Sequence, residues 1–151
     1  MTFQTAHFGP VPADESAAIE FPAGLPGFES CRRFTLMNLP GQQALVFLQS
    51  LERADLCFLA VPAQILRPDY RISLSDDDLE LLGFPAGRQP DPSGQIVALA
   101  LLSLVEGETP TANLLAPVVI HIQGRRAVQA IRPDGGYSCR EPFLIEEAVC
   151  S

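Results

Sequence analysis

Proline and glycine interrupt this chain so often that they limit what it can fold into. Its 151 residues include 14 prolines and 11 glycines, spread along nearly the whole length. Both residue types end or weaken helices, whereas short strands fit between such breaks. The sequence therefore predicts a mainly β fold with one or two short helices.

The segments between these breaks are short and largely apolar, as is typical of strands. Those in the middle of the chain follow one another at a spacing of about ten residues, which indicates an antiparallel barrel or sandwich without distinguishing the two. The expected strands are 3–8, 16–21, 33–39, 44–49, 56–61, 70–74, 95–105, 118–123 and 126–132. The first two are expected to form an opening pair. The segment 142–149 is expected to close the fold as a helix or a strand.

The strands near the end carry more specific patterns. Residues 95–105 are apolar on both faces, which predicts a strand in the middle of a sheet that is covered on both sides. The two-residue period of 118–123 predicts a strand with one buried face, and Gly124 predicts a hairpin turn into the next strand. Asn113 is expected to satisfy backbone groups at a bend that Pro117 also shapes.

A short helix is expected directly after Ser75. The serine hydroxyl can cap the helix by accepting from the backbone N–H near Asp78, and carboxylates in the first turn favour the positive end of the helix dipole. Gly83 can end the helix, and its leucines would face the body of the protein. The segment 84–94 is dense in proline and glycine and is expected to be a mobile loop.

The charge balance excludes several classes of function. Eighteen acidic residues stand against ten basic ones, all arginine, and the formal net charge is −8. Such a chain repels phosphate backbones, so we expect no direct nucleic-acid binding, whereas basic proteins are suitable partners. The longest apolar run, 96–105, is too short to span a membrane, and the N-terminus has no signal-peptide pattern. We expect a cytoplasmic protein with one domain over 1–151 and no membrane partner.

The sequence contains no catalytic, cofactor or metal motif. Its two histidines, His7 and His121, lie far apart, and its four cysteines form no C-x-x-C pair, so reduced structural thiols are expected. We therefore expect no catalytic residue, no cofactor and no bound metal. An enzyme or a flavin-binding small barrel, with a pocket that the sequence does not reveal, stays open as the alternative.

The acidic cluster at the start of the expected helix has three interpretations. Asp76, Asp77, Asp78 and Glu80 could cap the helix and face water, form a docking surface for a basic protein, or bind a metal ion. Three consecutive aspartates lack the alternating ligand spacing of a calcium loop. The spacing therefore argues against the metal and leaves the first two interpretations.

Several strings in the chain are similar to those of one protein family. Residues 21–29 read F-P-A-G-L-P-G-F-E after an F-G pair at 8–9, and 47–50 read F-L-Q-S. Residues 68–70 read P-D-Y before the expected helix, and 137–142 read Y-S-C-R-E-P. Residues 111–121 read T-A-N-L-L-A-P-V-V-I-H, with histidine where the family usually has asparagine. On these motifs the chain resembles the FliW family of flagellar assembly factors over nearly its full length.

The resemblance implies a small antiparallel β-barrel-like fold and a cytoplasmic regulator of flagellum assembly. Members of the family bind flagellin and also bind the translational repressor CsrA, which they hold away from flagellin mRNA, so the resemblance implies both partners here. Two groups of residues are hypothesised to bind partners. They are the acidic residues Asp76, Asp77, Asp78 and Glu80, and the apolar loop residues Leu25 and Phe28. For the loop residues, plugging the end of the barrel is the alternative.

Overall fold

The computed structural model describes residues 2–5, 9–12, 18–25, 27–39, 42–72, 74–85, 87, 89–90, 94–104, 107–131 and 138–142. Within these ranges the chain forms ten strands and two short helices. The strands are β1 (Thr2–Thr5), β2 (Gly9–Pro12), β3 (Ile19–Glu20), β4 (Arg33–Leu39), β5 (Gln42–Ser50), β6 (Cys57–Pro62), β7 (Ile96–Ser103), β8 (Thr111–His121), β9 (Arg126–Gln129) and β10 (Glu141–Pro142). The helices are α1 (Ala63–Leu66) and α2 (Asp76–Leu82).

Seven of the strands close into a barrel. Their order is β8, β7, β6, β5, β4, β3 and β9, and β9 pairs back onto β8. All of these pairings are antiparallel except β3 with β9, where Glu20 lies opposite Arg126. The Glu20 amide donates to the Arg125 carbonyl at 2.9 Å and so helps to join the two ends of the sheet. The predicted barrel is confirmed, and the sandwich alternative is excluded.

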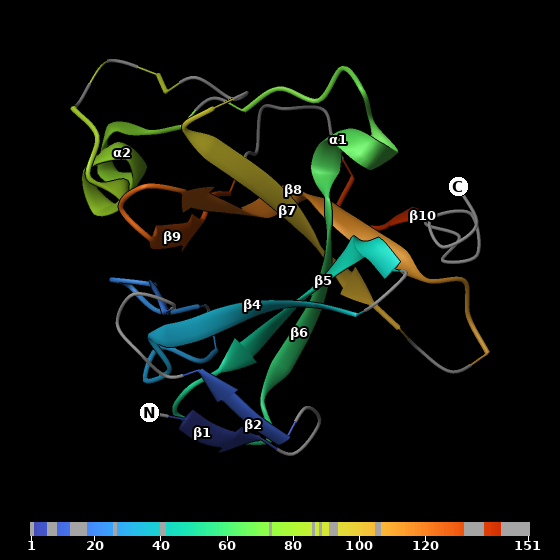
Figure 1. Ribbon diagram of the computed structural model, residues 1–151. Helices are drawn as coiled ribbons and strands as arrows, with labels where there is room; N and C mark the ends of the chain where they lie inside the picture. Colours follow the sequence, from blue (N-terminus) through green and yellow to red (C-terminus); the bar gives the residue numbers. More distant parts are fainter. Residues whose placement is uncertain are drawn as a thin grey trace.

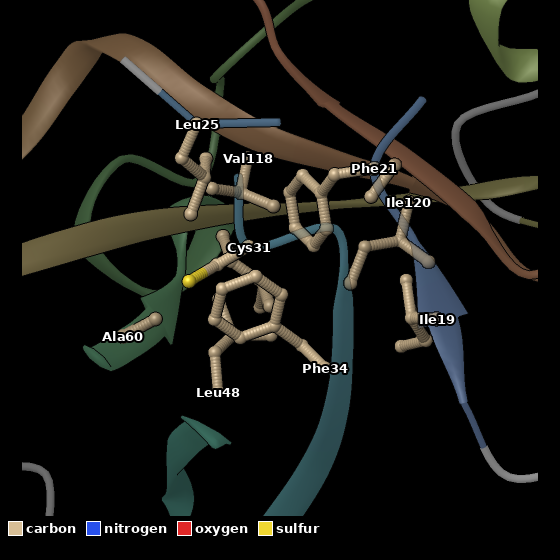
Figure 2. Close-up of a cluster of buried hydrophobic side chains, with 11 residues drawn as sticks. Ile19, Phe21, Leu25, Cys31, Phe34, Leu48, Ala60, Val118 and Ile120 are labelled. Atoms are coloured by element: carbon tan, nitrogen blue, oxygen red, sulfur yellow. The ribbon is translucent and has the colours of Figure 1, made fainter. Parts of the chain in front are cut away.

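Large apolar side chains fill the inside of the barrel (Figure 2). Phe21, Phe34 and Val118 are fully buried and belong to one cluster, although they lie far apart in the sequence. The rings of Phe21 and Phe34 meet edge to face, with centroids 5.1 Å apart, an arrangement that aromatic pairs prefer. Burial of each such side chain stabilises the fold by roughly 1.5–3 kcal/mol.

Helix α2 covers the outer face of the barrel beside β8 and β9 (Figure 1). Its buried Leu79 and Leu82 pack with Val119 and with neighbouring apolar side chains. Val118 and Val119, which point to opposite faces of β8, are therefore both 0% exposed. The prediction of one buried face for 118–123 is wrong because the helix shields the second face.

Most of the other expected strands are found close to their predicted positions. The expected strands at 33–39, 44–49, 56–61 and 95–105 correspond to β4, β5, β6 and β7. Strand β7 lies between β6 and β8, as predicted for a central strand, and the hairpin around Gly124 joins β8 to β9.

Two further expectations from the sequence need correction. The opening pair is formed by β1 and β2, which build a separate hairpin, so 9–12 is a strand and β1 does not pair with β3. Helix α1 agrees with the expected one or two short helices, although the sequence did not indicate its position. In the expected strand 70–74, the described residues 70–72 and 74 do not form a strand. Tyr70 is buried, and its hydroxyl donates to the Leu114 carbonyl at 2.7 Å. A side chain, rather than strand pairing, fastens this segment to β8.

Asn113 organises an irregularity in β8. The register against β7 shifts between Leu99, which lies opposite Val118, and Leu101, which lies opposite Asn113. The side-chain carbonyl oxygen of Asn113 accepts from the backbone N–H groups of residues 115 and 116 at 3.1 and 3.0 Å. The expected use of this asparagine for backbone groups at a bend is confirmed. Of the predicted closing segment, Pro142 lies in β10, which pairs with the start of β8, and 143–149 lie outside the described residues.

None of the helices in the described residues has the length and hydropathy that a membrane span requires.

Candidate functional site

Helix α2 forms as its local sequence predicts. The Ser75 hydroxyl accepts from the Asp78 amide at 3.1 Å, and three aspartates occupy the first turn, where they interact favourably with the helix dipole. Gly83 ends the helix in the left-handed conformation at φ 89° and donates to carbonyls of the last turn. These caps hold the acidic cluster on a defined element rather than on a loop.

The four carboxylates of the acidic cluster differ in their surroundings. Asp76, Asp77 and Glu80 are exposed, whereas Asp78 is half-buried. Asp76 also accepts from the Gly87 amide at 2.9 Å, so part of its hydrogen-bonding capacity is used within the protein. Asp77 and Glu80 are therefore the best-placed residues of the cluster to meet a partner.

The loop after α2 is attached to the body of the protein at two described positions. One attachment is the bond from Gly87 to Asp76. The other is Gln89, whose side chain accepts from the Leu74 amide at 2.9 Å and donates to the Leu74 carbonyl at 3.0 Å. The sequence predicts a mobile loop at 84–94, and these contacts restrain the parts of it that the structure describes.

A surface hollow of about 550 Å³ lies between α2 and the barrel, and we call it the acidic hollow. It is lined by Glu20, Pro22, Asp77, Glu80, Leu81 and Arg126. Sequence reasoning missed Glu20 and Arg126, because they lie on β3 and β9 and reach α2 only through the closure of the barrel. No local pattern in the sequence links them to the acidic cluster.

Leu25 and Phe28 lie on the turn-rich loop between β3 and β4. Leu25 is 2% exposed and points into the core cluster, as Figure 2 shows, and it forms an isolated bridge with Phe28. Phe28 is half-buried, and its ring meets that of Phe58 edge to face at 5.5 Å. These positions favour the alternative in which both residues plug the barrel. Their role in partner binding stays a prediction.

His121 joins the end of β8 to the end of α2. Its Nδ1 donates to the Leu82 carbonyl at 2.7 Å, and its ring lies over that of Phe84 with centroids 4.0 Å apart. The Gly124 Cα lies so close that a Cβ built there would be 2.8 Å from Nδ1. The half-buried histidine thus helps to hold the helix on the barrel.

The cysteines of the described residues are all free thiols. Cys31 is buried in the core, Cys57 is half-buried and Cys139 is exposed. Burial raises the pKa of the Cys57 thiol, which favours the protonated form over the nucleophilic thiolate. Among the described residues, no three His, Cys, Asp or Glu side chains are grouped so that they could hold a metal ion.

The cap of α2 can be tested without touching the acidic cluster. Replacing Ser75 with alanine removes the acceptor for the Asp78 amide and is expected to lower the free energy of unfolding by about 1 kcal/mol. Urea denaturation followed by circular dichroism measures the loss. Ser75→Asn keeps a capping side chain and is the matched control, which should unfold close to wild type. Equal losses in the two variants would show that a side-chain acceptor at the N-cap is not what stabilises the helix.

Comparison with known proteins gives concordant matches. A family model described as FliW protein matches residues 2–144. The chain is similar to the flagellar assembly factor FliW of Azoarcus sp. (strain BH72), with 36% identity over 87% of this chain and 90% of the relative. It is also similar to that of Bdellovibrio bacteriovorus, with 30% identity over 95% of this chain and 79% of the relative. A crystal structure of the flagellar assembly factor FliW superposes with a TM-score of 0.80 at 26% identity and covers 97% of this chain and 99% of that one.

Proposed function

This chain belongs to the FliW family of flagellar assembly factors, and we propose that it acts in the cytoplasm by binding two proteins, flagellin and the translational repressor CsrA. When flagellin is abundant, it occupies the chain. When flagellin is exported, the freed chain captures CsrA and so relieves the repression of flagellin mRNA. The chain in this scheme performs no catalysis.

The observation that carries this proposal is the acidic cluster on α2. Asp77 and Glu80 are exposed on a capped helix, in a chain whose formal net charge is −8. A protein that binds RNA presents cationic side chains to phosphates, and the same side chains are attracted to a fixed row of carboxylates. Charge complementarity of this kind raises the association rate and selects against acidic partners. The cluster is therefore suited to a basic protein such as an RNA-binding repressor.

The inside of the barrel gives less support to the alternative, an enzyme or a flavin-binding barrel, than the outer surface gives to protein binding. A flavin needs an enclosed pocket of several hundred cubic ångströms. Apolar side chains such as Phe21, Phe34 and Leu48 fill the barrel instead. A cavity between α1 and the start of β7 measures only about 60 Å³. Binding on the outer surface fits this molecule better than binding inside it.

Two binding measurements test the proposal. The purified chain is mixed with CsrA and, separately, with flagellin, and each complex is followed by isothermal titration calorimetry at low salt. We expect both to bind the wild-type chain. Absence of binding to both CsrA and flagellin would contradict the proposed function. A yellow preparation with flavin absorbance would favour the flavin-binding alternative.

A charge reversal tests the role of the acidic cluster. Glu80→Lys is expected to weaken CsrA binding about tenfold at low salt, and less at high salt, because it removes one attraction and adds one repulsion. Glu80 suits this test because a cation in the second half of a helix does not oppose the helix dipole. Glu108→Lys makes the same charge change at an exposed site outside α2 and is the matched control. Equal affinities of the Glu80 variant and the wild type would remove this surface from consideration.

A further inference from the structure

A second surface hollow, of about 470 Å³, lies next to the acidic hollow and has the opposite charge. Its lining residues are Ala18, Glu20, Arg33, Gly124, Arg125 and Arg126. Three arginines and one glutamate thus line this hollow, although the whole chain has only ten basic residues. We call it the basic hollow.

The backbone at Arg125 shows that this arginine is not required by the turn. Arg125 has φ 50°, and it is the only residue other than glycine with a positive φ in the described part of the chain. The left-handed conformation directs its carbonyl to the Glu20 amide, 2.9 Å away, where the barrel closes. Glycine would adopt this conformation without steric cost, whereas arginine carries a penalty of about 1 kcal/mol or more. The exposed side chain of Arg125 thus stands at a position where the backbone conformation favours glycine.

The two hollows are joined by a shared pair of residues. Glu20 and Arg126 lie opposite each other in the pairing of β3 with β9, and both line both hollows. On one side of this pair stand the α2 carboxylates Asp77 and Glu80, and on the other side stand Arg125 and Arg33. In Figure 1, α2 and β9 lie side by side. The combined surface therefore changes from negative to positive over a short distance.

Such a surface discriminates among ligands by charge pattern. A nucleic acid brings a continuous row of phosphates, which the carboxylates of the acidic hollow and the negative chain as a whole repel. A uniformly basic segment is attracted by Asp77 and Glu80 but repelled by the arginines. A segment with both signs can place its cation against the carboxylates and its carboxylate against the guanidiniums, which bind carboxylates through paired N–H donors.

We propose that the acidic and basic hollows form one bipartite docking surface for a protein segment of mixed charge, with basic side chains directed to α2 and an acidic group directed to Arg125 and Arg126. The inference rests on the proposed function, because it takes the chain to be a protein-binding factor. It adds that recognition requires an acidic group of the partner as well as its basic side chains.

An NMR titration of the isotope-labelled chain with synthetic peptides tests this surface directly. One capped peptide carries two lysines and two glutamates separated by a glycine-serine spacer, and two control peptides carry only lysines or only glutamates. At millimolar concentration and low salt, we expect the mixed-charge peptide to shift the backbone amide resonances of both hollows in a saturable way. Arg125→Gly, which relaxes the backbone, and Arg126→Gln should each weaken its binding by about two- to fivefold. Arg140→Gln is the matched control, because Arg140 is exposed beside β10 near the opposite end of β8, and it should bind as wild type does.

The possible results separate this inference from the proposed function. No saturable shift with the mixed-charge peptide would overturn the docking surface, even if CsrA and flagellin bind the chain elsewhere. Tighter binding of the all-glutamate peptide, or of a short single-stranded RNA, would also overturn it in favour of a simple anion site. Peptide binding in a chain that retains neither CsrA nor flagellin would uphold the surface and reject the two named partners.

Discussion

Replacing Phe34 with alanine is expected to lower the free energy of unfolding by about 3–5 kcal/mol, which is a large share of the stability of a domain of this size. Phe34 is fully buried in the barrel, with Phe21 at 5.1 Å and Phe58 at 6.1 Å between ring centroids. Alanine loses the transfer free energy of the ring and leaves a cavity, because strands held by a closed ladder cannot collapse far into the space. Urea denaturation monitored by circular dichroism measures the effect.

Leu36→Ala on the same strand is the control for this prediction. Leu36 is 38% exposed, so its truncation removes less buried surface and should cost only about 1 kcal/mol. Losses of similar size in the two variants would show that Phe34 does not occupy the close-packed centre that the structure gives it.

The second large effect is expected at Gly24. This residue has φ 71°, and a Cβ at its position would lie 2.6 Å from the Glu29 Cα and 2.7 Å from the Glu29 carbonyl oxygen. Gly24→Ala therefore combines an unfavourable backbone conformation with a clash against backbone atoms that cannot move aside easily. We expect a loss of about 3–5 kcal/mol, measured by thermal and urea unfolding.

Gly27 in the same loop separates the two causes. It also has a positive φ, 85°, but apart from its chain neighbours no atom of the described residues lies within 4 Å of the position of its Cβ. Gly27→Ala should then cost only the conformational part, about 1–2 kcal/mol. If Gly24→Ala were no more harmful than Gly27→Ala, the close approach of Glu29 to Gly24 would be contradicted.

The binding residues could be predicted only in part. The carboxylates of α2 stand out in the sequence because consecutive aspartates follow a capping serine. Their neighbours Glu20 and Arg126 carry no such signal, since each lies in an ordinary short strand far away in the sequence. Leu25 lies on a turn-rich loop, and the local sequence does not indicate whether its side chain points outward or into the core. Its 2% exposure follows from the position of the loop against the barrel.

The sequence by itself determined the features that depend on neighbouring residues. Ser75 caps the start of α2 through a local hydrogen bond, and Gly83 ends the helix in the left-handed conformation. The breaks around β4 and β5 separate those strands, and Gly124 permits the turn between β8 and β9. Each of these structures is stabilised by contacts within a few residues, so a short stretch of sequence contains the necessary information.

Only the tertiary structure decided how the short elements between the prolines and glycines are arranged in one molecule. The chain closes a barrel through the parallel pairing of Glu20 with Arg126, covers Val119 with α2 and fastens 70–72 by the bond from Tyr70 to Leu114. Such contacts depend on which strand edges and apolar faces remain free after the local elements have formed. The prolines and glycines therefore specify short strands, and long-range packing specifies the barrel and the two hollows on its surface.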